Sequence, residues 1–124
     1  MKKITTHKDL NVYQLSYNLT IEIFQLTKSF PREELYSLTD QIRRSSRSVP
    51  ANIAEAFRKR RYEKAFIAKL SDSEGEAAET QVWLDIAKDS KYISEEVHDE
   101  LYARYNDVLG KIVRMINTSK YWII

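Results

Sequence analysis

Apolar side chains recur along most of the chain at the three- and four-residue spacing of an α-helix. Four stretches carry this pattern, and they predict helices at about 10–29, 33–58, 62–89 and 94–119. The connections between them are short, and long helices joined in this way typically form an antiparallel up-down bundle. We therefore predict an all-α fold, with residues 1–124 as a single four-helix bundle domain.

The first stretch carries two competing patterns. Alternate residues from Leu15 to Ile23 are apolar, as in a strand. On a helix, the apolar side chains from Leu10 to Phe30 fall on two opposite faces. One face carries Val12, Leu15, Leu19, Ile23, Leu26 and Phe30, and the other carries Leu10, Tyr13, Tyr17, Ile21 and Phe24. We choose the helix, because no glycine or proline interrupts this stretch and no comparable second strand exists to pair with it. A two-faced helix needs a second partner outside its own bundle.

The second stretch has a core pattern and an internal proline. Its apolar positions are Leu35, Leu38, Ile42, Val49, Ile53, Ala56 and Phe57. Its start is open between Glu33 with Glu34 and a capping box of Ser37 with Asp40. Pro50 lacks a backbone donor and clashes with the carbonyl four residues earlier, so we expect a kink or a local opening between Ser46 and Pro50.

The third and fourth stretches each present one clear core face. The third carries Phe66, Leu70, Ser73, Ala77, Thr80, Leu84 and Ala87, whose small central members allow a neighbouring helix to approach closely. In the fourth, Ser94 is the predicted N-cap, and the core positions are Val97, Leu101, Tyr105, Val108, Ile112 and Met115. We expect the apolar tail from Tyr121 to Ile124 to pack against the domain, because an exposed apolar tail would promote aggregation.

Composition narrows the class of protein further. The sequence has two glycines and two prolines, too few for a fold built from many tight turns. It has no cysteine, so disulfides, thiolate metal sites and cysteine nucleophiles are excluded. Neither a signal peptide nor a membrane span is recognisable, and we expect a cytoplasmic protein with no membrane partner.

Most of the positive charge lies between residues 41 and 64. This segment has eight cationic and two acidic side chains in a chain whose net charge is +2, so the remainder is acidic. Arginine matches phosphate oxygens with a planar fork. The predicted nucleic-acid-binding residues are Arg43, Arg44, Arg47, Arg58, Lys59, Arg60, Arg61 and Lys64.

The basic segment has other interpretations. Asp72, Glu76 and Glu79 form an acidic stripe on the next helix, which could neutralise the arginines within the bundle. The acidic surface of a protein partner is a further possibility. If nucleic acid binds, Tyr62 beside the basic turn is a candidate for base stacking, whereas Phe57 lies on the core stripe.

No pattern in the chain predicts catalysis or a bound cofactor. A di-metal bundle needs two Glu-x-x-His motifs, and Glu95 with His98 forms only one. The other histidine, His7, lies outside the bundle, so the sequence favours neither a metal site nor a nucleophilic triad. We expect no catalytic residues, no metal and no cofactor.

Three segments resemble a known family. They are LNVYQLSYNL at 10–19, FPREELYSLTDQIRRS at 30–45 and SVPANIAEA at 48–56. The chain resembles the four-helix bundle proteins encoded by intervening sequences in bacterial 23S ribosomal RNA genes, also called the S23 ribosomal protein family. It is also similar to the accessory protein of diversity-generating retroelements. The best match is Ser48, Pro50, Asn52, Ala54 and Glu55, and this chain has Ala56 where the family usually has glycine.

The resemblance implies a homopentameric ring, no known enzymatic activity and a nucleic-acid-related role. The second apolar faces of the first and fourth helices independently favour an oligomer. The predicted interface residues are Tyr13, Tyr17, Ile21, Phe24, Tyr102, Leu109 and Val113.

Two functional hypotheses follow from the sequence. The first is a non-catalytic oligomer that binds the RNA or DNA backbone through its basic surface. The alternative is a structural hub that recruits a protein partner, such as a polymerase or reverse transcriptase, without touching nucleic acid itself.

Overall fold

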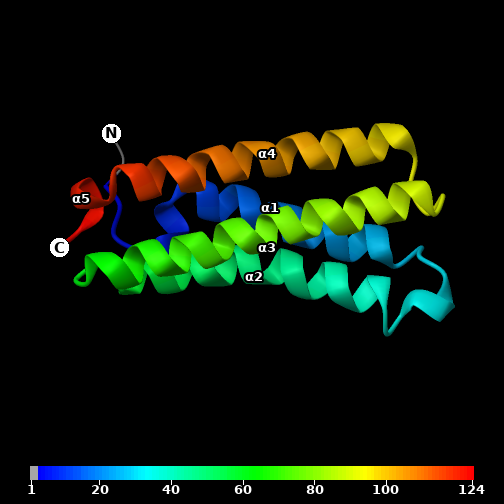
Figure 1. The fold of residues 1–124 in the computed structure, drawn as a ribbon, viewed down its shortest axis with the longest axis horizontal. Coiled ribbons are helices and arrows are strands. Elements are labelled where there is room, and N and C mark those ends of the chain that lie inside the picture. The colour runs from blue at the N-terminus through cyan, green and yellow to red at the C-terminus, as the bar shows by residue number, and fades with distance from the viewer. Residues whose placement is uncertain (1–2) are drawn as a thin grey trace.

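A computed structural model describes residues 3–124, which form an antiparallel bundle of four long helices (Figure 1). The long helices are α1 (Asn11–Thr27), α2 (Leu38–Arg58), α3 (Glu63–Asp89) and α4 (Glu95–Asn117). The short elements are the 3₁₀ helices η1 (His7–Asp9) and η2 (Arg32–Glu34) and the terminal helix α5 (Ser119–Trp122). The predicted all-α bundle is confirmed, and the strand interpretation of the first stretch is wrong because residues 11–27 are helical.

The four helices share one apolar core, and most predicted core positions lie in it. The largest fully buried side chains include Leu19, Ile42, Phe66, Leu84 and Tyr105. Two expectations are wrong. Leu35, predicted to be a core residue, is 41% exposed because it precedes α2. Leu10, predicted to lie on the second face of the first helix, is buried because it precedes α1.

The connection between α1 and α2 is longer than expected. α1 ends at Thr27, since the next three amides bond three residues back instead of four. α2 begins at Leu38, and Ser37 is its N-cap residue by position only. The cap is the carboxylate of Glu34, which accepts hydrogen bonds from the Ser37 hydroxyl at 2.9 Å and the Leu38 amide at 3.3 Å. The predicted capping box of Ser37 with Asp40 is therefore wrong.

α2 continues through Pro50. The Ser46 carbonyl, four residues earlier, receives no amide from the proline and instead accepts a hydrogen bond from the Thr20 hydroxyl of α1 at 2.9 Å. The local opening expected near Pro50 is therefore limited to one carbonyl without its helical hydrogen bond, and a side chain of α1 donates to that carbonyl.

α2 and α3 lie side by side along their length (Figure 1). The Ser73 hydroxyl donates to the Val49 carbonyl at 2.8 Å, and the hydroxyls of Ser45 and Thr80 are 2.8 Å apart. These buried bonds require the close approach that the small residues of α3 predicted.

The ends of α4 are fixed by specific contacts. The Ser94 hydroxyl accepts the Val97 amide at 3.1 Å, which confirms the predicted N-cap. After α4, the tail turns into α5, and its Trp122 and Ile123 pack against the core while Tyr121 stays 83% exposed. No helix in residues 3–124 is long and apolar enough to span a membrane.

Candidate nucleic-acid interface

The predicted basic surface consists of two separate groups of side chains. Arg43 and Arg58 are fifteen positions apart on one helix, which corresponds to about 22 Å. The mid-helix group is Arg43, Arg44 and Arg47, and the turn group is Arg58, Lys59, Arg60, Arg61 and Lys64. The two groups therefore have different surroundings.

The mid-helix group is engaged with neighbouring side chains. Arg43 is half-buried, donates from Nε to the Thr27 hydroxyl at 2.8 Å, and lies over the Phe24 ring at 4.7 Å. Arg47 and Lys28 approach the same ring at 5.8 and 5.0 Å. Cation–π contacts of this kind hold the guanidinium groups against α1 and cover the Phe24 ring. Of this group, Arg44 and Arg47 are exposed.

The turn group is more open. α2 ends at Arg58, and Arg58, Lys59, Arg61 and Lys64 are all exposed. Arg60 is the exception, because its Nε donates to the Phe57 carbonyl at 2.8 Å and its guanidinium lies 3.6 Å from the centre of the Phe57 ring. Burial, together with the charge of Arg58, lowers the pKa of Arg60. The turn therefore presents four freely accessible cations around one anchored arginine.

The acidic stripe of α3 does not neutralise these cations. Within residues 3–124, no ion pair joins Asp72, Glu76 or Glu79 to an arginine of either group. Asp72 instead lies 3.9 Å from Lys69, and the Trp83 indole donates to Glu79 at 3.2 Å. Burial, followed by the charges of Glu79 and Asp72, raises the pKa of Glu76. The expectation of internal neutralisation by this stripe is wrong.

The C-terminal tail lies against the basic turn, and Figure 1 shows α5 at the end of the bundle where α2 and α3 are connected. The Ser119 hydroxyl donates to Glu63 at 2.8 Å, and Lys120 bonds the other oxygen of that carboxylate at 3.3 Å. These two bonds lower the pKa of Glu63. The Ile124 amide also donates to the Arg60 carbonyl at 3.3 Å.

Charge is segregated between the two ends of the bundle. We call residues 58–64 and 111–124 the cationic end; they carry eight lysines and arginines and a single carboxylate side chain, Glu63. Residues 28–40 and 85–100 form the acidic end, with nine carboxylates and four lysines and arginines. The Tyr92 hydroxyl joins the two acidic segments by donating to Glu34 at 2.7 Å. The cations that our sequence analysis missed are Lys111, Arg114 and Lys120.

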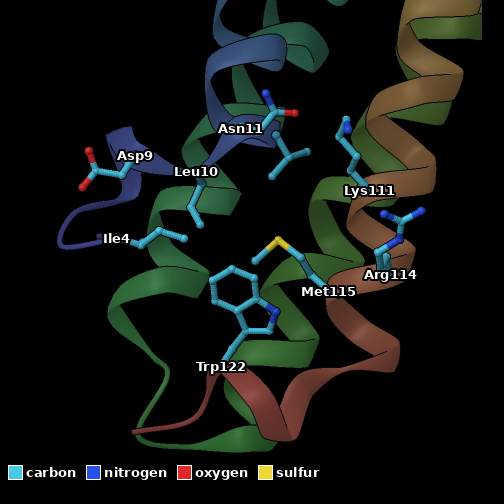
Figure 2. Close-up of a pocket in the computed structure, with 9 residues that line it drawn as sticks. Ile4, Asp9, Leu10, Asn11, Lys111, Arg114, Met115 and Trp122 are labelled. Atoms are coloured by element: carbon cyan, nitrogen blue, oxygen red, sulfur yellow. The ribbon is translucent and has the colours of Figure 1, made fainter. Parts of the chain in front are cut away.

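An apolar pocket of about 410 Å³ lies at the cationic end (Figure 2). Leu10 between η1 and α1, Met115 on α4 and Trp122 on α5 point into it, and Lys111 and Arg114 lie at its edge on α4. Within residues 3–124, neither of these cations takes part in an ion pair. Asp9 of η1 also lines the pocket, so the lining combines two cations with one carboxylate. The apolar walls can accept an apolar or aromatic group.

The predicted oligomer interface is exposed only in part. Tyr17, Ile21 and Val113 are 48%, 46% and 37% exposed. The other predicted members, Tyr13, Phe24, Tyr102 and Leu109, are half-buried within their own chain. An exposed apolar pair that the sequence analysis missed, Val82 and Ile86, lies on α3.

His98 holds α4 to α3. It is buried, with Nε2 2.6 Å from the Asp85 carboxylate and Nδ1 2.8 Å from the Asp99 carboxylate. Burial lowers the pKa of His98, but hydrogen bonds to Asp99 and Asp85 outweigh it, and the pKa is raised overall. Residues 3–124 contain no cluster of three or more side chains arranged to hold a metal ion.

Comparisons with known proteins agree with this architecture. The sequence model of the 23S rRNA-intervening sequence protein family matches residues 8–117. A crystal structure from Bacteroides thetaiotaomicron VPI-5482, described as a protein with unknown function from the S23 ribosomal protein family, is 28% identical, with a TM-score of 0.78. The match covers 86% of this chain and 95% of that chain. No curated protein matches the chain.

Proposed function

The chain belongs to the 23S rRNA-intervening sequence protein family, and the matched crystal structure is described as a protein with unknown function. From the residues of this chain we propose that it binds nucleic acid. In this proposal the cationic end contacts the phosphate backbone of RNA or DNA, and the protein performs no catalysis. One observation carries it: residues 58–64 and 111–124, from the α2–α3 turn, the end of α4 and α5, bring eight cations and one carboxylate side chain to the same end of the bundle.

The accessibility of these cations supports phosphate binding. Arg58, Lys59, Arg61 and Lys64 are exposed, and within residues 3–124 none of them belongs to an ion pair. A phosphate therefore has no carboxylate to displace from them. Lys and Arg side chains that neutralise phosphates release counterions, which makes binding strongly salt-dependent.

The decisive experiment compares two neutralised variants. The first, R58Q/K59Q/R61Q/K64Q, removes four charges from the cationic end. The control, K28Q/R32Q/K88Q/K91Q, removes all four cations of the acidic end and changes the net charge by the same amount. Fluorescence anisotropy with labelled RNA and DNA, measured over a salt series, gives the affinity of each.

We expect the first variant to lose at least tenfold in affinity and to show a shallower salt dependence, by about 0.7 to 0.9 in log–log slope for each lost phosphate contact. The control should bind like the wild type. Equal losses in both variants, or no binding by the wild type at low salt, would reject the proposal.

We also propose that the chain assembles as a cyclic homo-oligomer, with five subunits as the family resemblance suggests. The supporting observation is the exposure of Tyr17 and Ile21 on α1 and of Val113 on α4. Light scattering should give a mass of several times 14.6 kDa for the wild type. Ile21→Asp should shift that mass toward that of a single chain, because assembly would bury a charged carboxylate in an apolar interface, which is costly. A monomeric wild type at micromolar concentration would contradict assembly.

Recruitment of a protein partner is the second candidate function. The exposed pair Val82 and Ile86 on α3 favours it, since adjacent exposed apolar residues suit a protein contact. A nucleic-acid-handling protein that binds the wild type but not V82D/I86D, with nucleic-acid affinity unchanged, is the result expected from this hypothesis.

A further inference from the structure

Two highly exposed aromatic rings lie among the cations of the cationic end. Tyr62 is 65% exposed and Tyr121 is 83% exposed. The two residues are far apart in the sequence, and α5 brings the second close to the first through the bonds of Ser119 and Lys120 to Glu63. Tyr36, which is 91% exposed, belongs to the acidic end and provides a natural comparison.

Both tyrosines are held by local backbone contacts. Tyr62 is the N-cap residue of α3, with its amide bonded to the Lys59 carbonyl at 3.0 Å. The Tyr121 amide bonds the Thr118 carbonyl at 2.9 Å, and its ring meets the Trp122 ring edge-on, with centroids 5.6 Å apart. The backbone bonds fix the points from which both rings project, and the Trp122 contact also orients the Tyr121 ring, which lowers the entropic cost of binding.

Exposed aromatic rings among cations have a specific use in nucleic-acid recognition. Bases stack on aromatic side chains while the neighbouring phosphates are bound by lysine and arginine, and such binding tolerates any base sequence. Stacking requires an accessible base face, and the faces of paired bases in a duplex are covered by their neighbours. Tyr62 and Tyr121 therefore favour an unpaired strand over a duplex.

The pocket of Figure 2 provides a further place for an unpaired base. Its walls include Trp122 and Met115, and its lining also carries the cations Lys111 and Arg114 on α4 and the carboxylate of Asp9 on η1. Its volume of about 410 Å³ lies in the range of pockets that take small ligands. A base that leaves the strand can enter this pocket, whereas a paired base cannot.

We propose that the cationic end binds single-stranded nucleic acid, with bases stacked on Tyr62 and Tyr121 and phosphates held by the exposed cations of the α2–α3 turn. This inference rests on the nucleic-acid binding proposed above and adds the substrate class. The chemistry is shared by RNA and DNA, so both are tested.

The experiment measures the affinity of the full chain for three labelled probes at one salt concentration. The probes are a short oligouridylate, an oligothymidylate of equal length and a DNA duplex of that length. The wild type should bind both single strands more tightly than the duplex. Y62L/Y121L keeps side chains of similar apolar character but removes the rings, and it should lose about tenfold per ring on the single strands. Its affinity for the duplex should be unchanged.

The control variant is Tyr36→Leu, which removes an even more exposed ring from the acidic end. It should match the wild type on all three probes. Circular dichroism of each variant verifies that the bundle is intact.

An optical readout follows from the contact between Tyr121 and Trp122. Trp83 is the only other tryptophan in the sequence, so Trp83→Phe leaves Trp122 as the sole indole emitter. Addition of oligouridylate or oligothymidylate should quench this emission. Addition of the duplex should change it less.

The outcomes separate the two proposals. If Y62L/Y121L loses affinity equally for single strands and duplex, or keeps its single-strand affinity, or if the wild type prefers the duplex, the stacking proposal is wrong while backbone binding stands. If the wild type binds none of the three probes, both proposals are wrong.

Discussion

The hydroxyl of Tyr105 on α4 is buried, and among residues 3–124 it has no hydrogen-bond partner. Burial raises the pKa of this phenol, so it stays neutral. An unsatisfied buried hydroxyl costs about 1–3 kcal/mol. We therefore predict that Tyr105→Phe increases the free energy of unfolding by about 1 kcal/mol, measured by urea denaturation.

Tyr92 is the matched control for this prediction. Its hydroxyl donates to Glu34 at 2.7 Å, so Tyr92→Phe should lower stability. A decrease for both variants would mean that the Tyr105 hydroxyl has a partner in solution, such as a buried water.

The α3–α4 pair depends on the protonation of His98. Both ring nitrogens are bonded to carboxylates, of Asp85 and Asp99, and only the doubly protonated ring can donate to both. Lys88 is the nearby positive charge that opposes this protonation. Because the pKa of His98 is raised in the folded chain, its stabilising effect is complete below the unfolded value of about 6.5 and is lost as the pH rises through the folded value.

We predict that the free energy of unfolding falls as the pH rises above about 6.5. His98→Gln should lose about 1 kcal/mol at pH 6, because the carboxylates are partly exposed, and should show no such fall. Chemical denaturation at a series of pH values measures both effects. His7→Gln is the control, and a wild-type curve that stays flat between pH 6 and 9 would contradict the prediction.

Helices α1 and α2 are coupled through Pro50. The proline frees the Ser46 carbonyl, and the Thr20 hydroxyl, whose one proton is shared with the Ser16 carbonyl at 2.8 Å, donates to it at 2.9 Å. Thr20→Val should lower stability by about 1 kcal/mol in the wild type and by less in a Pro50→Ala chain, whose amide can bond the same carbonyl. A double-mutant cycle should give a coupling energy of about 0.5–1 kcal/mol. Additive effects would show that the threonine acts only through packing.

At the scale of the whole molecule, eight cations at one end repel one another. Salt screens exposed like charges over about 10 Å at 0.1 M. We predict that raising the salt from low to moderate concentration increases the melting temperature of the wild type by about 2 °C. R58Q/K59Q/R61Q/K64Q should melt slightly higher than the wild type at low salt and respond less to salt.

The quadruple variant of the acidic end is the control for this effect. Removing cations from an acidic surface should lower the melting temperature at low salt, the opposite direction. Equal salt responses in both variants would mean that the charge segregation has no energetic effect on the fold.

The sequence by itself determined the helices and their buried faces. Phe66, Leu70 and Leu84 recur on one face of α3, and Leu101, Val108 and Ile112 recur on one face of α4. Periodicity is a local property, so no knowledge of the neighbours is needed to read it. Ser94 was equally readable, because an N-cap and its amide partner lie within one turn.

Only the tertiary structure decided which charges stay free. It showed Arg43 held by Thr27 and Phe24, Arg60 held by Phe57, and Glu34 capping a helix that begins four residues later. It also brought the tail that carries Tyr121 to the basic turn. The Arg43 contacts and the docking of the tail join residues distant in sequence, whereas the Arg60 and Glu34 contacts are local but follow no periodic pattern. The energy of a charge depends on what surrounds it in space, which periodicity does not encode.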